Sequence, residues 1–171
     1  MSDRAATRSL TTDQPAGAGT PWRRVFVLPL LTLLLSLLGL GIAGYLTYTH
    51  FQEEALVCTF GGCHTVQESE YATIGPVPIA ILGLGMYVAV AATALLRIIP
   101  NRLIAPDMAN LAAWGMAFAA VLYYAYLTYI ELFVIDAICQ WCVASAITTL
   151  GILSVESIML RRNFLLDEAA A

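Results

Sequence analysis

The sequence predicts an all-α integral membrane protein, a four-transmembrane-helix bundle with an outer loop between the first and second helices. The chain has 171 residues, of which 60% are hydrophobic and only 12% charged, a balance far from that of a soluble domain of this size. The few charges leave four uncharged stretches, each covering the roughly 20 residues that a helix needs to cross the hydrocarbon core. The arginines cluster at alternate ends of these stretches, as the loops of a membrane protein require.

The four uncharged stretches are expected to be helices, because lipid offers a chain segment no partner for its backbone hydrogen bonds. We expect the spans near residues 25–49, 77–99, 108–134 and 139–160. The domain division follows from these spans and from the polar composition of the N-terminal segment. We expect a disordered cytoplasmic tail at residues 1–22, one membrane domain at residues 23–162 and a short cytoplasmic tail at residues 163–171.

The eight cationic side chains, all arginine, predict the orientation. They precede the first span and follow the second and fourth spans, whereas residues 50–76 contain four glutamates and no cation. The positive-inside rule therefore places both termini and the 98–107 loop in the cytoplasm and the acidic loop outside. No block of basic residues is present that would bind nucleic acid, so nucleic acid is excluded as a partner.

Four cysteines form two close pairs on the predicted outer side of the membrane, where disulfides persist. Cys58 and Cys63 enclose the segment TFGG in the outer loop, where a soluble protein has access to them. Cys139 and Cys142 form a CQWC motif at the start of the fourth span. Unpaired amide groups and the helix dipole favour a thiolate in this first turn.

The spacing of the cysteines leaves three interpretations open. Electrons can pass by thiol–disulfide exchange from an outside thiol to the loop pair, then to the CQWC pair and into a lipid-soluble oxidant such as a quinone. The alternative is a non-catalytic tetraspan in which the cysteines form structural disulfides or bind a zinc ion.

Glu156, near Arg161 and Arg162, is expected to be a paired or snorkelling carboxylate at the inner end.

Four tyrosines lie toward the outer half of the third span, which should lie beside the fourth because the two are joined by only a few residues. Tyr123 and Tyr126 are candidates to line a quinone pocket. An interfacial belt of aromatic side chains is the alternative interpretation of this cluster.

The stretch CTFGGCHTVQESEYATIGPVPIAILGLGMY, followed later by CQWC, resembles the vitamin K epoxide reductase family, particularly its bacterial homologues. The resemblance covers roughly residues 25–160 and is far more specific than a CxxC motif alone. The residues in the order typical of the family are Cys58, Cys63, Val66, Ser69, Tyr71, Ala72, Gly75, Pro78, Gly83 and Tyr87.

This resemblance implies a four-helix bundle around a quinone, with the loop pair as shuttle cysteines and the CxxC pair as the active centre. Cys58 would meet the partner thiol, and Cys63 would carry electrons across by attacking Cys139. Cys142 would face the quinone, and Ser69 matches a loop serine that steadies the active site in the family. No metal ligands are expected.

One departure from the family bears on the substrate. Vertebrate members carry a tyrosine four residues after the second CxxC cysteine, where this chain has Ala146, a residue expected beside the quinone. We therefore predict reduction of a quinone, menaquinone or ubiquinone, and not of an epoxide. Only 11 residues follow Leu160, so the thiol donor is expected to be a separate thioredoxin-like protein. The predicted function is reoxidation of that protein at a bacterial cell membrane, with electrons passed to the quinone.

Overall fold

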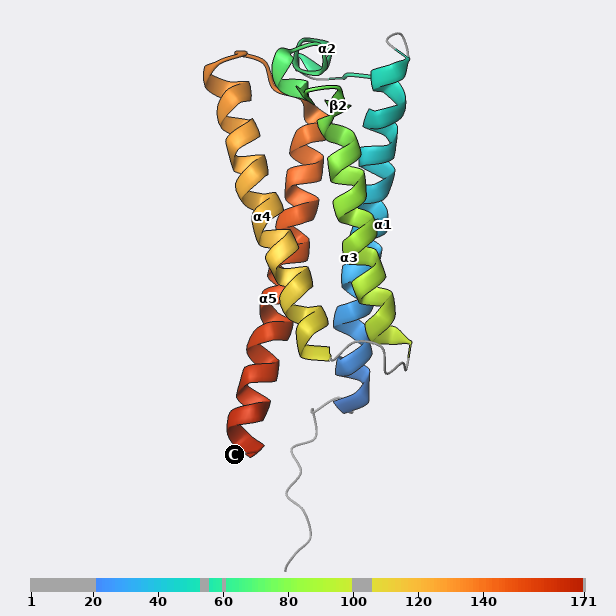
Figure 1. The fold of residues 1–171 in the computed structure, drawn as a ribbon, viewed down its shortest axis with the longest axis vertical. Coiled ribbons are helices and arrows are strands. Elements are labelled where there is room, and N and C mark those ends of the chain that lie inside the picture. The colour runs from blue at the N-terminus through green and yellow to red at the C-terminus, as the bar shows by residue number, and fades with distance from the viewer. Residues whose placement is uncertain (1–20, 53–55, 60, 100–105, 171) are drawn as a thin grey trace, which may run out of the picture.

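Four long helices form the bundle (Figure 1). The computed structural model describes residues 21–52, 56–59, 61–99 and 106–170. The long helices are α1 (Pro21–Phe51), α3 (Ile79–Ile98), α4 (Pro106–Phe133) and α5 (Gln140–Ala170). Each contains a segment long and apolar enough to cross a membrane. The predicted fold class is confirmed.

The helix boundaries differ from the expected spans mainly in the last helix. α5 begins at Gln140, as expected, but continues to Ala170, and its apolar segment reaches Leu165. The expected N-terminal tail lies almost entirely outside the described residues. The C-terminal residues from 163 to 170 are helical and continue α5 without a break.

A small cap covers the end of the bundle at which α1 ends and α5 begins (Figure 1). It consists of α2 (Cys63–Gln67), the 3-10 turn η2 (Glu70–Ala72) and the antiparallel hairpin of β1 (Thr73–Ile74) and β2 (Val77–Pro78). The turn between the two strands requires a positive φ, which Gly75 supplies at 62°. The cap therefore connects α1 to α3 across the top of the bundle.

Inside the bundle, α1 packs against α3, and α5 packs against both α1 and α4. The approach of α1 to α3 depends on Gly39, because a Cβ there would overlap the ring of Tyr87. Tyr87 is fully buried and points its hydroxyl at α5. Close packing at Gly39 thus fixes a tyrosine hydroxyl in the middle of the bundle.

A buried ion pair joins the helices toward the other end. Arg97 on α3 contacts Glu156 on α5 at 2.9 Å, and Glu156 is fully buried. The Thr32 hydroxyl on α1 donates to the same carboxylate at 2.8 Å, and Arg97 also donates to the carbonyl of Ala109 on α4. Glu156 is therefore a paired carboxylate, as expected, but its partner is Arg97 and not the arginines that follow it in sequence.

Candidate functional site

The structure brings all four cysteines to the capped end of the bundle. Cys58 and Cys63 form a disulfide with a Cα–Cα distance of 6.0 Å, and Cys139 and Cys142 are free thiols. Cys63 and Cys139 are both completely buried in one hydrophobic cluster, against which Cys58 and Cys142 also pack. The two pairs therefore lie together, with the inner cysteine of each pair shielded from solvent.

Backbone contacts hold the loop pair over the CxxC pair. The Gly62 amide donates to the carbonyl of Ile138 at 3.0 Å, and Gly61 forms an isolated antiparallel bridge with Cys139. Gly61 has a φ of 89°, and a Cβ there would overlap the Ile138 carbonyl oxygen. We call these four residues the loop–CxxC junction. The two glycines of TFGG permit this close approach of two backbones.

The residues between the CxxC cysteines hold the segment that carries Cys58. The Trp141 indole donates to the carbonyl of Val57 at 3.0 Å, and the Val57 amide donates to the Tyr45 hydroxyl at 2.8 Å. The rings of Tyr45 and Trp141 pack with their centroids 4.7 Å apart. The Thr59 amide donates to the side-chain oxygen of Gln140 at 3.3 Å. Cys58 is thus flanked on both sides by residues bound to the CxxC turn.

Cys139 precedes the first turn of α5, and its surroundings favour the thiolate. The Cys142 thiol donates a hydrogen bond to the Cys139 sulfur, and this bond is the largest cause of a pKa lowered from 9.0 to about 7. The backbone amides of Cys142 and Trp141 add to the effect, while burial opposes it. The net effect of these contacts is to favour the thiolate of Cys139.

Beneath the CxxC pair lies an apolar cavity of about 450 Å³. Cys142 reaches its wall, as do the side chains of Tyr124, Ser145 and Glu131. The rest of the lining is mostly aliphatic and comes from all four long helices and from the cap. An apolar cavity of this size with a few convergent polar groups has the usual form of a small-molecule site.

A chain of hydroxyl groups lies at one side of this cavity. The Ser145 hydroxyl, one turn after Cys142, lies 2.5 Å from the Tyr124 hydroxyl and 2.8 Å from that of Tyr87. The Tyr87 hydroxyl continues to Thr149 at 2.8 Å. These contacts satisfy hydroxyls that are buried or half-buried between the helices, where an unpaired polar group is costly.

Glu131 also lines the cavity, from the last turn of α4. Its carboxylate accepts a hydrogen bond from the Cys139 amide at 3.4 Å, and the residue is only 4% exposed. In the sequence, Glu131 marks only the end of the third uncharged stretch. Its distance of eight residues from Cys139 gives no helical register, because α4 ends and α5 begins between them.

The other residues expected at the site occupy different positions. Ser69 and Tyr123 line the cavity, and the Ser69 hydroxyl donates to the carbonyl of Val66 at 2.7 Å, at the end of α2. Tyr126 is 54% exposed, and neither Tyr126 nor Ala146 is among the residues that line the cavity. Within the part of the chain that the structure describes, no group of three or more metal-binding side chains is found.

A disulfide packed next to a pair of free thiols, above an apolar cavity in a membrane bundle, defines the class of membrane thiol–disulfide oxidoreductases. A comparison with known protein families agrees. Residues 30–157 match the vitamin K epoxide reductase family, and the chain belongs to this family. It is therefore a quinone-dependent thiol/disulfide oxidoreductase.

The first prediction concerns the loop–CxxC junction. In a Cys58→Ser/Cys142→Ser background, Cys63 and Cys139 remain, and their disulfide forms only if the junction keeps them together. Adding Gly61→Ala should lower the effective concentration of the two thiols by at least about 10-fold, because the Cβ displaces the loop from Ile138. Equilibration with glutathione buffers, followed by thiol trapping, measures this value.

Gly75→Ala is the matched control for this prediction. Gly75 also has a positive φ, but a Cβ there would meet no atom within 4 Å. An equal loss of effective concentration in both variants would contradict the role of the junction and point to general loop strain.

The second prediction concerns pH. In the fully reduced Cys58→Ser/Cys63→Ser variant, the ultraviolet absorbance of the Cys139 thiolate should rise with pH and have its midpoint near 7, the pKa of this thiol. Cys142→Ala removes the main hydrogen bond to the thiolate, so the pKa should rise and the midpoint should move to higher pH, toward 9.0. A pH titration of this absorbance measures both profiles. An unchanged midpoint in the variant would show that Cys142 does not stabilise the thiolate.

Proposed function

We propose that this chain is a bacterial member of its family that reoxidises a thioredoxin-like protein outside the cytoplasm and passes the electrons to menaquinone or ubiquinone. The observation that carries the proposal is the order of the sulfur atoms. Cys58 is half-buried in the loop, Cys63 and Cys139 are buried together, and Cys142 faces the cavity. This order runs from water toward lipid, and it supports disulfide bond formation as the cellular task.

The electron route follows from thiol–disulfide exchange. A thiolate of the partner attacks Cys58, the second partner thiol closes the partner's disulfide, and the loop pair becomes a dithiol. Cys63 then attacks Cys139 of an oxidised CxxC pair and releases Cys142 as a thiol. Cys58 finally attacks Cys63, which reforms the loop disulfide and releases Cys139 as a thiolate.

The last of these steps benefits from the environment of Cys139. A thiol with a lower pKa is a better leaving group in disulfide exchange, and the pKa of Cys139 is about 7. The product of this step has a loop disulfide and a CxxC dithiol, which is the arrangement in the structure. The CxxC dithiol then holds the two electrons next to the cavity.

The cavity is suited to a quinone ring as the second substrate. Its lining is mostly aliphatic, and the linked hydroxyls of Tyr124 and Ser145 offer a hydrogen bond to a quinone oxygen. Tyr123 adds an aromatic wall, and Ser69 supports the end of α2 above the ring. Tyr126 and Ala146 stay predicted pocket residues. Because Ala146 replaces the vertebrate tyrosine, we propose quinone reduction without epoxide reduction.

The distribution of arginine supports an orientation in which the capped end is outside the cytoplasm. The described residues at that end carry Glu68 and Glu70, whereas Arg97, Arg161 and Arg162 lie toward the opposite ends of their helices. Both termini and residues 163–171 would then be cytoplasmic. The cysteines would lie in an oxidising compartment.

The third prediction tests the electron route. Purified protein supplied with a reduced thioredoxin-like donor should reduce quinone, and Cys139→Ser or Cys142→Ser should abolish the reaction, because the CxxC disulfide can no longer form. The change in quinone absorbance measures turnover. Ser154→Ala, on the exposed face of α5, is the control and should leave the rate unchanged. Full activity in both cysteine variants would refute the assignment of the CxxC pair.

The fourth prediction tests the orientation. In a background with all four cysteines replaced by serine, a cysteine is introduced at one of two exposed glutamates, Glu70 in the cap or Glu168 near the end of α5. On intact cells, a membrane-impermeant maleimide should label Glu70→Cys at once and Glu168→Cys only after permeabilisation. The reverse pattern would place the capped end in the cytoplasm and would contradict the proposed location.

A further inference from the structure

We propose that Glu131 is the proton-transfer residue between the Cys142 thiol and the quinone. This inference rests on the proposed function and assigns a further catalytic group to the same site. The starting observation is that the Glu131 carboxyl group is buried at an energetic cost, which is typical of groups with a function.

Glu131 is buried within a membrane-spanning helix and lacks the compensation that the other buried glutamate has. Glu156 is fully buried but pairs with Arg97 and accepts a hydrogen bond from Thr32. Among the described residues, no arginine or histidine forms an ion pair with Glu131. Burying a carboxyl group at membrane depth without a cation is costly, so such groups mark proton relays or ligand sites more often than structural positions.

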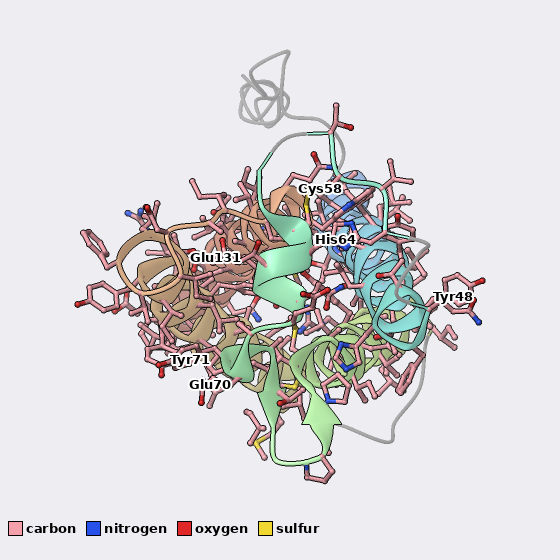
Figure 2. All side chains as sticks on the ribbon, turned by 90° about the horizontal axis from the view of Figure 1, so that it is seen from above. Tyr48, Cys58, His64, Glu70, Tyr71 and Glu131 are labelled. Atoms are coloured by element: carbon pink, nitrogen blue, oxygen red, sulfur yellow. A yellow bond between two sulfur atoms is a disulfide. The ribbon has the colours of Figure 1, made fainter. Side chains whose placement is uncertain are left out.

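The contacts of Glu131 are with the reacting groups. Its carboxylate accepts a hydrogen bond from the Cys139 amide at 3.4 Å, and Glu131 and Cys142 line the same cavity. Viewed from above, Glu131 lies within the outline of the bundle (Figure 2). It is the only carboxyl group among the described residues that line the cavity. One side chain thus contacts the electron donor and faces the space for the acceptor.

The redox step needs a proton acceptor at this position. The reactants are the Cys139 thiolate, the Cys142 thiol, the quinone and one proton from water at the outer face. The Cys142 S–H bond breaks, its proton passes to the Glu131 carboxylate, and the sulfurs of Cys139 and Cys142 form a disulfide. The two electrons released by the sulfurs reduce the quinone. The proton on Glu131 and the proton from water complete the quinol, and Glu131 returns to the carboxylate.

The hydroxyl groups in the cavity are less suited to this task. Tyr124 and Ser145 hydrogen-bond to each other, and Ser145 also bonds to Tyr87. Neutral hydroxyls of this kind orient a quinone oxygen but do not accept a thiol proton as a carboxylate does. Proton transfer and quinone orientation are therefore divided between Glu131 and the hydroxyl chain.

A purely structural role for Glu131 would be to cap α5. Its carboxylate accepts a hydrogen bond at the beginning of that helix, where a negative charge is also favourable. A glutamine has nearly the same shape and keeps an oxygen that accepts this hydrogen bond, but it does not take up a proton. Glu131→Gln therefore separates the two roles.

The fifth prediction uses single-turnover kinetics. Fully reduced protein is freed of reductant and mixed with ubiquinone-1 or menaquinone-1, whichever the wild-type protein reduces, and quinol formation is followed by absorbance. Glu131→Gln should slow this step about 100-fold, the usual range for loss of a general acid–base group. Quinone affinity, measured by quenching of tryptophan fluorescence, should remain unchanged. The Cys63–Cys139 effective concentration should also be that of the wild type.

Two further variants complete the experiment. Glu70→Gln removes an exposed carboxyl group from the cap and should react at the wild-type rate. Glu131→Asp keeps a carboxyl group and should recover a large part of the rate lost in Glu131→Gln.

The outcomes distinguish the two proposals. Glu131→Gln at the wild-type rate, or with weakened quinone binding in place of a slower reaction, overturns proton transfer by Glu131 and leaves the electron route intact. Failure of the wild-type protein to reduce either quinone overturns the proposed function and the role of Glu131 with it.

Discussion

The site depends on one backbone contact, the loop–CxxC junction of Gly61, Gly62, Ile138 and Cys139. Two segments far apart in sequence meet there through one hydrogen bond and one bridge. Both loop residues are glycines, and their lack of a side chain permits the two backbones to approach this closely. The contact positions the loop disulfide next to Cys139, the alignment that the proposed exchange between the pairs requires, because sulfur attack needs near contact.

Burial at the junction separates the solvent-accessible part of the site from the part next to the apolar cavity. Cys63 and Cys139 are completely buried and so are shielded from outside thiols, whereas Cys58 is only half-buried. Beneath them, Cys142 belongs to a largely apolar cavity. Three polar side chains of this cavity, Tyr124, Ser145 and Glu131, are hydrogen-bonded to one another or to the backbone, as burial in a membrane requires. The same arrangement that excludes water therefore concentrates the few groups able to move protons.

The sequence predicts the helices well because charge is so costly in lipid that each uncharged stretch has one possible structure. It also places both cysteine pairs at one end, since topology alone decides that. The sequence does not predict the rotation of each helix about its own axis. Helices that are apolar on all sides give no periodic signal for the face that turns inward, so the sequence did not separate Tyr124, linked to Ser145, from the exposed Tyr126.

Long-range pairing is equally hidden in the sequence. Glu156 stands near Arg161 and Arg162 along the chain, but α5 directs it inward to Arg97 on another helix. Glu131 appears in the sequence as the charge that ends a span, and only the turn between α4 and α5 brings it to Cys139. The hairpin of the cap is also not predictable from the sequence, because its two-residue strands are too short to give an alternating pattern.

The two ends of the bundle are held by contacts of different kinds. Toward one end, Arg97 and Glu156 form a buried ion pair whose separation would leave a charge uncompensated in the membrane, at a cost of about 3–5 kcal/mol. At the capped end, the loop is held by hydrogen bonds from Trp141 to Val57, from Thr59 to Gln140 and from Gly62 to Ile138, each worth only about 1 kcal/mol. These weaker bonds can break without disturbing the helices. Because Gln140 and Trp141 lie between the CxxC cysteines, the turn that carries the reactive thiols is also the turn that holds the loop, and neither can change its geometry independently of the other.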